Sequence, residues 1–268
     1  MTYSDIPRLL TMTIFWQLLL VWYLLADRIN CGVALALLAL LTMALFISGA
    51  EMKLTRRRIF LDECLEPRTF LFRVFQRRYV LLVFEFLKAA VLALFLMVSV
   101  LDFVPRHWSL MFAVVLLLGL LLPRFHGALA GQLREEYRYV TARRWAMWVS
   151  TIFLWLESLI VFLFADERNF SGLRWQEVIS YGASEPDLAC TPLASMASIL
   201  SAVDALGQWA IQNFARSFMD LPQGLIASIG ILVAVGLSFL QAYAYSRVLI
   251  GVVGRPWTMW RVDSPGPT

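Results

Sequence analysis

The sequence has few charged residues. Only 16% of its 268 residues are Asp, Glu, Lys or Arg, whereas 60% are hydrophobic. A soluble domain of this composition would have too little polar surface to cover its apolar side chains. Lipid must cover the remainder, so the composition predicts an integral membrane protein.

The sequence is also poor in the residues that bind metals and cofactors. Its three cysteines, Cys31, Cys64 and Cys190, show no C-x-x-C spacing, and its two histidines, His107 and His126, stand at opposite ends of one apolar run. These patterns favour neither a metal centre nor a disulfide framework nor haem ligation. No H-E-x-x-H, G-x-S-x-G or P-loop motif is present. We therefore predict no cofactor, no metal and no enzymatic activity.

What the sequence does have is long apolar runs. A bilayer core of about 30 Å takes roughly 20 helical residues to cross. Six runs approach or exceed this length, at 9–26, 31–50, 80–101, 108–123, 146–165 and 224–246. No small-residue cleavage site follows the first run, so we predict that it is retained as a span. The predicted fold class is an all-α integral membrane protein, in which residues 1–268 form a single polytopic domain with a six-helix transmembrane bundle.

Basic residues are divided unequally between the two sides of this predicted bundle. Seventeen Lys and Arg fall in the N-terminus, the C-terminal tail and the segments 51–79 and 124–145, against five on the opposite side, which also carries nine acids. Cytoplasmic loops carry the excess of Lys and Arg. We therefore predict a multi-pass protein of the cell inner (plasma) membrane with both termini in the cytoplasm. Because the basic residues lie between apolar runs rather than on one folded domain, we predict no nucleic-acid binding.

Amphipathic patterns outside the spans predict an interfacial helix on each face of the membrane. On the cytoplasmic side, segment 51–79 has helical periodicity around a cationic face and a break near Pro67. It is interpreted as a connector or, alternatively, as a contact for anionic lipid or a partner. The basic residues of that contact are Arg56, Arg57, Arg58, Arg77 and Arg78.

The outer loop 166–223 divides into two halves. The first half is rich in turn formers and has no long periodicity, whereas residues 195–221 repeat as an amphipathic helix that Ser195 can cap. We predict that this helix lies in the outer interface, with a polar stripe that alternatively lines an aqueous path. The stripe consists of Ser201, Asp204, Gln208, Gln212 and Arg216. Cys31 and Cys190 both fall on this side, where an oxidised pair is possible but two free thiols are expected.

Three charges lie inside the predicted spans. Glu85 and Lys88 are three residues apart in the third span, and Glu157 is placed about 17 Å into the fifth, near the midplane. Charges at that depth are costly unless they face protein or water. We predict that Glu85, Lys88 and Glu157 form an intramembrane charge cluster in which Lys88 meets Glu157. Such a cluster fixes helix packing or, alternatively, makes Glu157 a proton- or cation-coupling carboxylate.

These observations favour a non-enzymatic integral membrane subunit of a larger inner-membrane assembly of the secretion, export or defence type. Its helices would pack through small residues and buried charges, and its partners would be the lipid bilayer and other membrane subunits or further copies of itself. The alternative is an oligomeric ion or proton channel, transporter or pore-forming protein that uses Glu157 and the polar stripe of 195–221.

Overall fold

The chain is helical throughout the part that the computed structural model describes. That part comprises residues 6–64, 78–103, 105–133, 135–164, 169–184, 188–213 and 221–253. Within these ranges there are eight α-helices, one short 3-10 helix (η1, Val100–Asp102) and no strand, which confirms the all-α prediction. The helices are α1 (Ile6–Leu25), α2 (Cys31–Cys64), α4 (Arg78–Ser99), α5 (Pro105–Ala128), α6 (Glu135–Phe164), α7 (Trp175–Ser184), α8 (Thr191–Gln212) and α10 (Leu221–Val252).

Five of these helices, α1, α2, α4, α5 and α10, are long and apolar enough to cross a membrane. Their apolar stretches are 18 to 30 residues long, with mean hydropathies of 1.5 to 2.4. The chain is thus a multi-pass membrane protein by length and composition. The predicted run 146–165 falls in α6 as far as Phe164, but residue 165 and the side chains from residue 161 onward fall outside the described residues. Its role as a sixth span stays a prediction.

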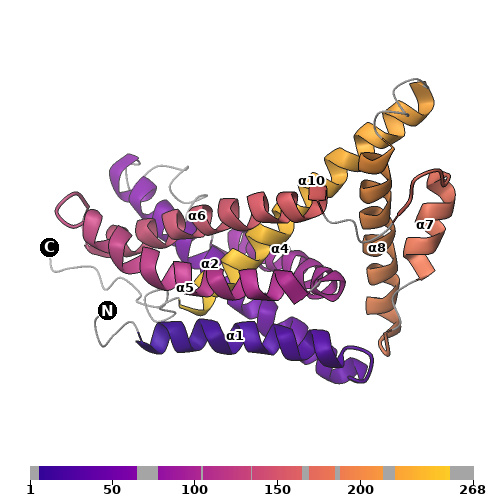
Figure 1. Ribbon diagram of the computed structural model, residues 1–268. Coiled ribbons are helices and arrows are strands. Elements are labelled where there is room, and N and C mark those ends of the chain that lie inside the picture. The colour runs from indigo at the N-terminus through magenta and orange to yellow at the C-terminus, as the bar shows by residue number, and fades with distance from the viewer. Residues whose placement is uncertain are drawn as a thin grey trace, which may run out of the picture.

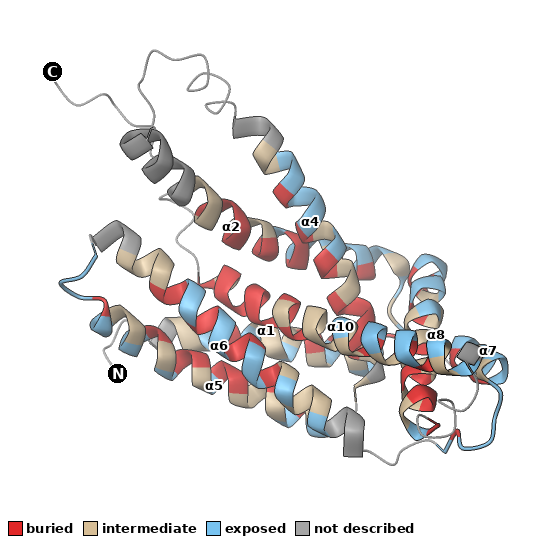
Figure 2. Ribbon diagram, turned by 90° about the horizontal axis from the view of Figure 1, so that it is seen from above, coloured by how far each residue is buried: buried red, intermediate tan, exposed pale blue. Residues whose placement is uncertain are grey.

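The bundle has two distinct ends (Figure 1). The start of α1, the end of α10 and the α5–α6 turn lie at one end, which we call the inner end. The α1–α2 turn lies at the opposite, outer end, where α7 and α8 cross the bundle at a steep angle to α1 and α5. Seen from above, α10 runs between α2 and α4 on one side and α5 and α6 on the other (Figure 2). It packs against α2, α4, α6 and α8 and so connects the parts of the molecule.

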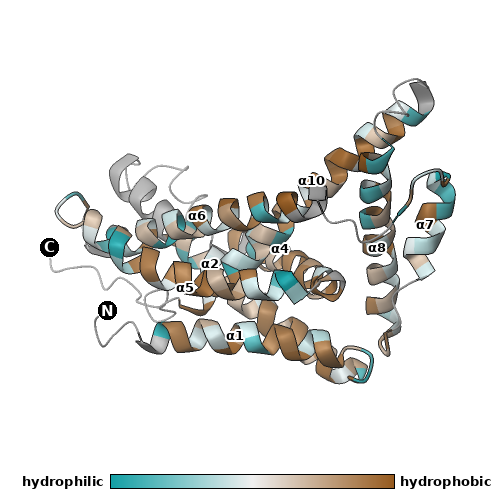
Figure 3. Ribbon diagram, in the orientation of Figure 1, coloured by the Kyte–Doolittle hydropathy of each residue, from teal (hydrophilic) through white to brown (hydrophobic). Residues whose placement is uncertain are grey.

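The outward faces of the bundle are apolar. Leu10, Val91 and Leu232 are 61%, 65% and 74% exposed, and many other large apolar side chains are exposed with them. Figure 3 shows hydrophobic residues along the bundle helices, while hydrophilic ones gather at the α1–α2 and α5–α6 turns and around α7. Apolar surface of this extent is rare on soluble monomers, so the exposed faces are consistent with a lipid surround.

The outer segment differs from its prediction at three points. Residues 175–184, where only turns were expected, form α7, which pairs with α8 around buried Val178, Ala205 and Trp209. Helix α8 begins at Thr191, so Ser195 lies inside it and donates a hydrogen bond to the Thr191 carbonyl instead of capping the helix. It ends at Gln212, earlier than the predicted residue 221, and residues 214–220 are outside the described ranges.

Cys31 and Cys190 form a disulfide, which corrects the expectation of two free thiols. Their Cα atoms are 4.8 Å apart although 159 positions separate them in sequence. Sequence spacing gave no indication of this pair because the fold, rather than the chain, brings the first residue of α2 next to the N-cap of α8. The bond fastens the outer pair α7–α8 to the N-terminal half of the bundle.

The segment 51–79, which the sequence predicted to be cytoplasmic, begins as a continuation of α2. Helix α2 runs without a break from Cys31 to Cys64, so no separate helix starts after residue 50. The predicted break at Pro67 falls outside the described residues. The same holds for the side chains of Arg56, Arg57, Arg58, Arg77 and Arg78. Their contact with lipid or a partner stays a prediction.

Candidate functional site

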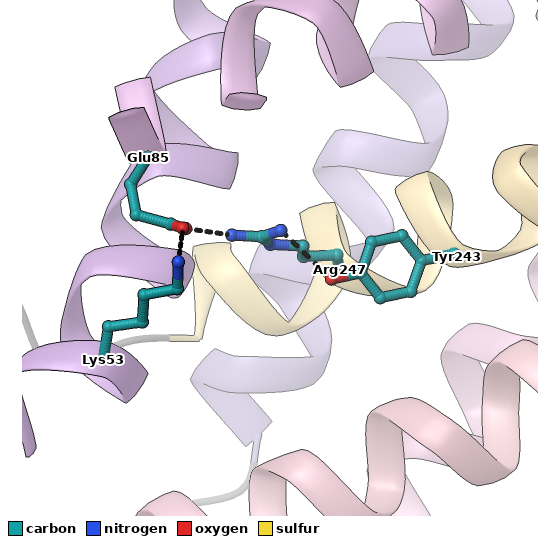
Figure 4. A network of polar contacts seen from close by, with 4 residues as sticks. All are labelled: Lys53, Glu85, Tyr243 and Arg247. Carbon is teal, nitrogen blue, oxygen red and sulfur yellow. Dashed lines mark hydrogen bonds and ion pairs between the residues drawn. The ribbon is translucent and has the colours of Figure 1, made fainter. Parts of the chain in front are cut away.

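A polar network lies between three helices in the inner half of the bundle (Figure 4). Glu85 of α4 forms ion pairs with Lys53 of α2 and with Arg247 of α10, whose Nη2 atom is 2.9 Å from Oε2 of Glu85. The Nη1 group of Arg247 donates a hydrogen bond of 3.1 Å to the Tyr243 hydroxyl. Glu85 is 0% exposed and Arg247 is 2% exposed. One buried carboxylate therefore joins α2, α4 and α10.

A second network lies nearby and adds α6. Arg143 of α6 is buried and pairs with Glu51 of α2, and its Nη2 group donates a 2.6 Å hydrogen bond to the Ile250 carbonyl of α10. The Tyr139 hydroxyl donates to the Val253 carbonyl at 2.9 Å, just beyond the end of α10. Together the two networks join four helices through charged groups that compensate one another.

Glycine allows these helices to approach each other. A Cβ atom at Gly49 of α2 would collide with both Arg247 and Glu85, and one at Gly251 of α10 would collide with the Ala44 carbonyl. A larger residue at Gly251 would push α2 and α10 apart, whereas one at Gly49 would displace the paired side chains of Arg247 and Glu85. The backbone approach and the ion pairs therefore depend on each other.

The structure separates the three charges that the sequence predicted as one cluster. Glu85 takes Lys53 and Arg247 as its partners. Lys88 is exposed, and its Nζ atom lies 5.9 Å from the ring centroid of Tyr243. Among the described residues no ion pair joins Lys88 to Glu85 or to Glu157.

Lys88 does not pair with Glu157 because the two residues lie at different depths in the bundle. Tyr243, beside Lys88, contacts Trp148 of α6 at 5.9 Å between ring centroids. Glu157 follows Trp148 by nine residues, which places it about 14 Å further along the helix. Lys88 and Glu157 thus lie at different levels of the bundle.

Glu157 instead lines a small cavity nearer the outer end. The cavity measures about 20 Å³, which is about the room that one water molecule needs. His107, the third residue of α5, lines it as well, together with Met111 of α5 and Tyr245 of α10. Glu157 Oε2 and His107 Nδ1 are both buried without a hydrogen-bond partner. Arg106 is near enough to interact electrostatically with both side chains.

The polar stripe of α8 is largely used within the fold. Ser201 is buried, and Gln208 donates a hydrogen bond of 2.9 Å to Asp204. Gln212 Oε1 accepts a hydrogen bond of 2.7 Å from the Phe170 backbone N–H. Arg216 lies outside the described residues. The use of the stripe to line a path remains untested.

Sequence reasoning missed four charged members of the two networks and the tyrosines Tyr139 and Tyr243. Lys53, Glu51, Arg143 and Arg247 were assigned to cytoplasmic segments because each stands at the edge of an apolar run. One signal was present: Val-Leu-Ile-Gly-Val-Val follows Arg247, so the last apolar run continues past this charge to residue 253. A charge with apolar residues on both sides has to be buried or paired.

Chemically, the ion pairs of the two networks hold helices together. Their carboxylates are occupied by guanidinium and ammonium groups. Among the described residues no group of three His, Cys, Asp or Glu is arranged to hold a metal ion. Comparison of the chain with protein-family models, curated proteins and solved structures finds no match.

Proposed function

We propose that the chain is a non-enzymatic integral membrane subunit of a larger inner-membrane assembly, of the secretion, export or defence type. One observation carries this proposal: the buried charges Glu51, Glu85, Arg143 and Arg247 compensate one another across four helices. Removing one partner of a buried ion pair is costly. Because these pairs join different helices, they specify which helices pack together. A chain that uses its buried polar groups in this way is suited to present a fixed apolar surface.

We propose six spans, with α6 as the fifth, the inner end in the cytoplasm and α8 in the outer interface. Three of the seventeen basic residues assigned to the cytoplasm, Lys53, Arg143 and Arg247, are engaged in the networks, which leaves fourteen against five. The charge difference that favours a cytoplasmic inner end therefore persists. The Cys31–Cys190 disulfide supports the same orientation, since disulfides persist in oxidising compartments such as the bacterial periplasm.

The test is extraction of the tagged chain from its native membrane with a mild detergent. The expected result is a complex of fixed stoichiometry that contains other polypeptides, measured by native mass and by quantitative mass spectrometry. Recovery of the chain alone, or only of copies of itself, would contradict the proposal.

A second candidate, an oligomeric proton or cation channel, is favoured by one observation, the cavity that Glu157 shares with His107. If the chain is such a channel, liposomes that contain the purified protein pass protons or monovalent cations, and Glu157→Gln abolishes this flux. Absence of flux through liposomes that contain the wild-type protein excludes this candidate.

A further inference from the structure

Lys88 is a cation on a lipid-facing surface. It lies on the same face of α4 as Phe84, Leu87 and Val91, at positions three and four residues apart. These three apolar side chains are 63%, 58% and 65% exposed, and Lys88 is exposed with them. We call these four residues the α4 stripe.

The α4 stripe lies in the middle of a span. Lys88 follows Arg78, the first residue of α4, by ten positions, or about 15 Å, in a helix of 22 residues. A charge at that depth on a lipid-exposed face is unfavourable, so ionisable residues within spans normally face protein and pair. Within the described part of the chain, the contact of Lys88 is with the Tyr243 ring, and no carboxylate pairs with it.

The acids within the described helices of the bundle, Glu51, Glu85 and Glu157, do not pair with Lys88. Glu51 and Glu85 are paired with Arg143, Lys53 and Arg247. Glu157 lies about 14 Å further along α6 than Trp148, the residue of α6 that contacts Tyr243, and a second copy related by an axis along the membrane normal would present it at that same unsuitable depth.

We propose that the α4 stripe binds a transmembrane helix of a different polypeptide, one that carries an Asp or Glu at the depth of Lys88. This inference rests on the proposed function as a subunit. Charge complementarity selects the partner, because a carboxylate over Lys88 would remove the unpaired charge of both chains from hydrocarbon at once. Phe84, Leu87 and Val91 supply the apolar surface on which the partner helix packs.

The tyrosine beneath Lys88 supports this geometry. Tyr243 is approached by Lys88 at 5.9 Å from α4 and by Trp148 at 5.9 Å from α6, and its hydroxyl accepts a hydrogen bond from Arg247. Tyr243 belongs to α10, which runs between α4 and α6 (Figure 2). Lys88 is thereby positioned for a partner without closing an ion pair inside the chain.

The experiment compares Lys88→Arg, Lys88→Met and Lys88→Glu with the wild-type chain, each tagged and expressed in its native membrane. Copurifying polypeptides are quantified by mass spectrometry after mild extraction. We expect Lys88→Arg to retain the partner, Lys88→Met to lower its recovery on the order of tenfold, and Lys88→Glu to lower it further. Arg28→Met, which removes an exposed charge at the outer end, is the matched control and should retain the partner.

Two further measurements make the result specific. Thermal unfolding of Lys88→Met in detergent should match that of the wild type, since no ion pair within the described chain is lost, so reduced recovery cannot be ascribed to misfolding. Exchange of the partner's intramembrane Asp or Glu for Lys should restore recovery with Lys88→Glu but not with the wild-type chain.

Unchanged recovery of the same polypeptides with Lys88→Met and Lys88→Glu overturns the inference and leaves the proposed function standing. A partner without an intramembrane acid overturns it as well, as does a Lys88-dependent loss of bound anionic phospholipid alone. A wild-type chain that brings down no other polypeptide overturns both proposals.

Discussion

At the scale of single residues, Glu85 is the carboxylate that joins three helices. It is fully buried and forms ion pairs with both Lys53 and Arg247. Its loss would leave Arg247, which is itself 2% exposed, as an uncompensated buried charge beside Tyr243. In a bundle surrounded by lipid, water has little access to such a group.

Glu85→Gln is therefore expected to lower the free energy of unfolding by about 3–5 kcal/mol. Removing both charges in Glu85→Leu with Arg247→Met should recover much of this loss. The measurement is unfolding in detergent micelles followed by circular dichroism. Arg28→Gln, which alters an exposed pair at the outer end, is the control and should unfold like the wild type. Equal losses in the Glu85 single variant and the double variant would show that the pair does not couple these helices.

Gly49 gives a second prediction at this scale. A methyl group there would collide with the side chains of Arg247 and Glu85. Gly49→Ala should therefore lower the free energy of unfolding by about 1–3 kcal/mol, through displacement of the ion pair. Gly236 of α10 has open space where a Cβ would stand, so Gly236→Ala should be neutral or slightly stabilising. Parallel melting curves of the two variants check this, and similar curves would contradict the close packing at Gly49.

At the scale of the elements, hydropathy predicted the helices better than their partners. All six apolar runs lie in helices, since length and composition are local properties. The predicted first and last residues of the helices were less accurate. The run 224–246 was ended before the first charge, Arg247, whereas α10 extends over Leu221–Val252. The helix continues past Arg247 because Glu85 pairs with this charge. The segment before α8 was assigned to turns, yet α7 forms there because it packs against α8.

The partners of the charged residues could not be predicted from local sequence. The sequence predicted that Lys88, three residues from Glu85, meets Glu157 within one cluster, but α2 and α10 bring Lys53 and Arg247 to Glu85 instead. Helix neighbours depend on which small residues allow close approach, and Gly49 and Gly251 were not distinguishable in sequence from the other glycines. The site thus depends on which helices pack together, and the periodicity of the sequence does not predict that.

The disulfide leads to a prediction for α8. Cys31–Cys190 attaches its first turn to α2, and the rest of α8 packs on α7 and α10. Cys31→Ser or Cys190→Ser should lower stability by about 2–4 kcal/mol, the usual contribution of a disulfide. Maleimide labelling without reductant should modify only Cys64 in the unfolded wild-type chain, whereas reductant should make all three cysteines reactive. Labelling of all three without reductant would contradict the bond.

At the scale of the whole molecule, the arrangement of turns predicts the topology. The α5–α6 turn at Gly131 and the turn before α7 at Gly172 are exposed and lie at opposite ends of the bundle (Figure 1). A fluorescent reporter inserted after Gln132 should be active as a cytoplasmic fusion, and alkaline phosphatase inserted after Ser171 should be active in the outer compartment. Exchanging the two reporters between the sites is the control, and each should then be inactive. Reporters at both sites that report one compartment would contradict the six-span topology.

The place of α10 in the chain has a consequence for biosynthesis. This helix follows the other described helices in the chain, yet it supplies Arg247 to Glu85 and the Ile250 carbonyl to Arg143. The earlier helices are therefore inserted with polar groups that stay unsatisfied until α10 joins them. A chain released before residue 247 would leave those groups without partners, so synthesis has to pass α10 before the bundle can reach its final packing.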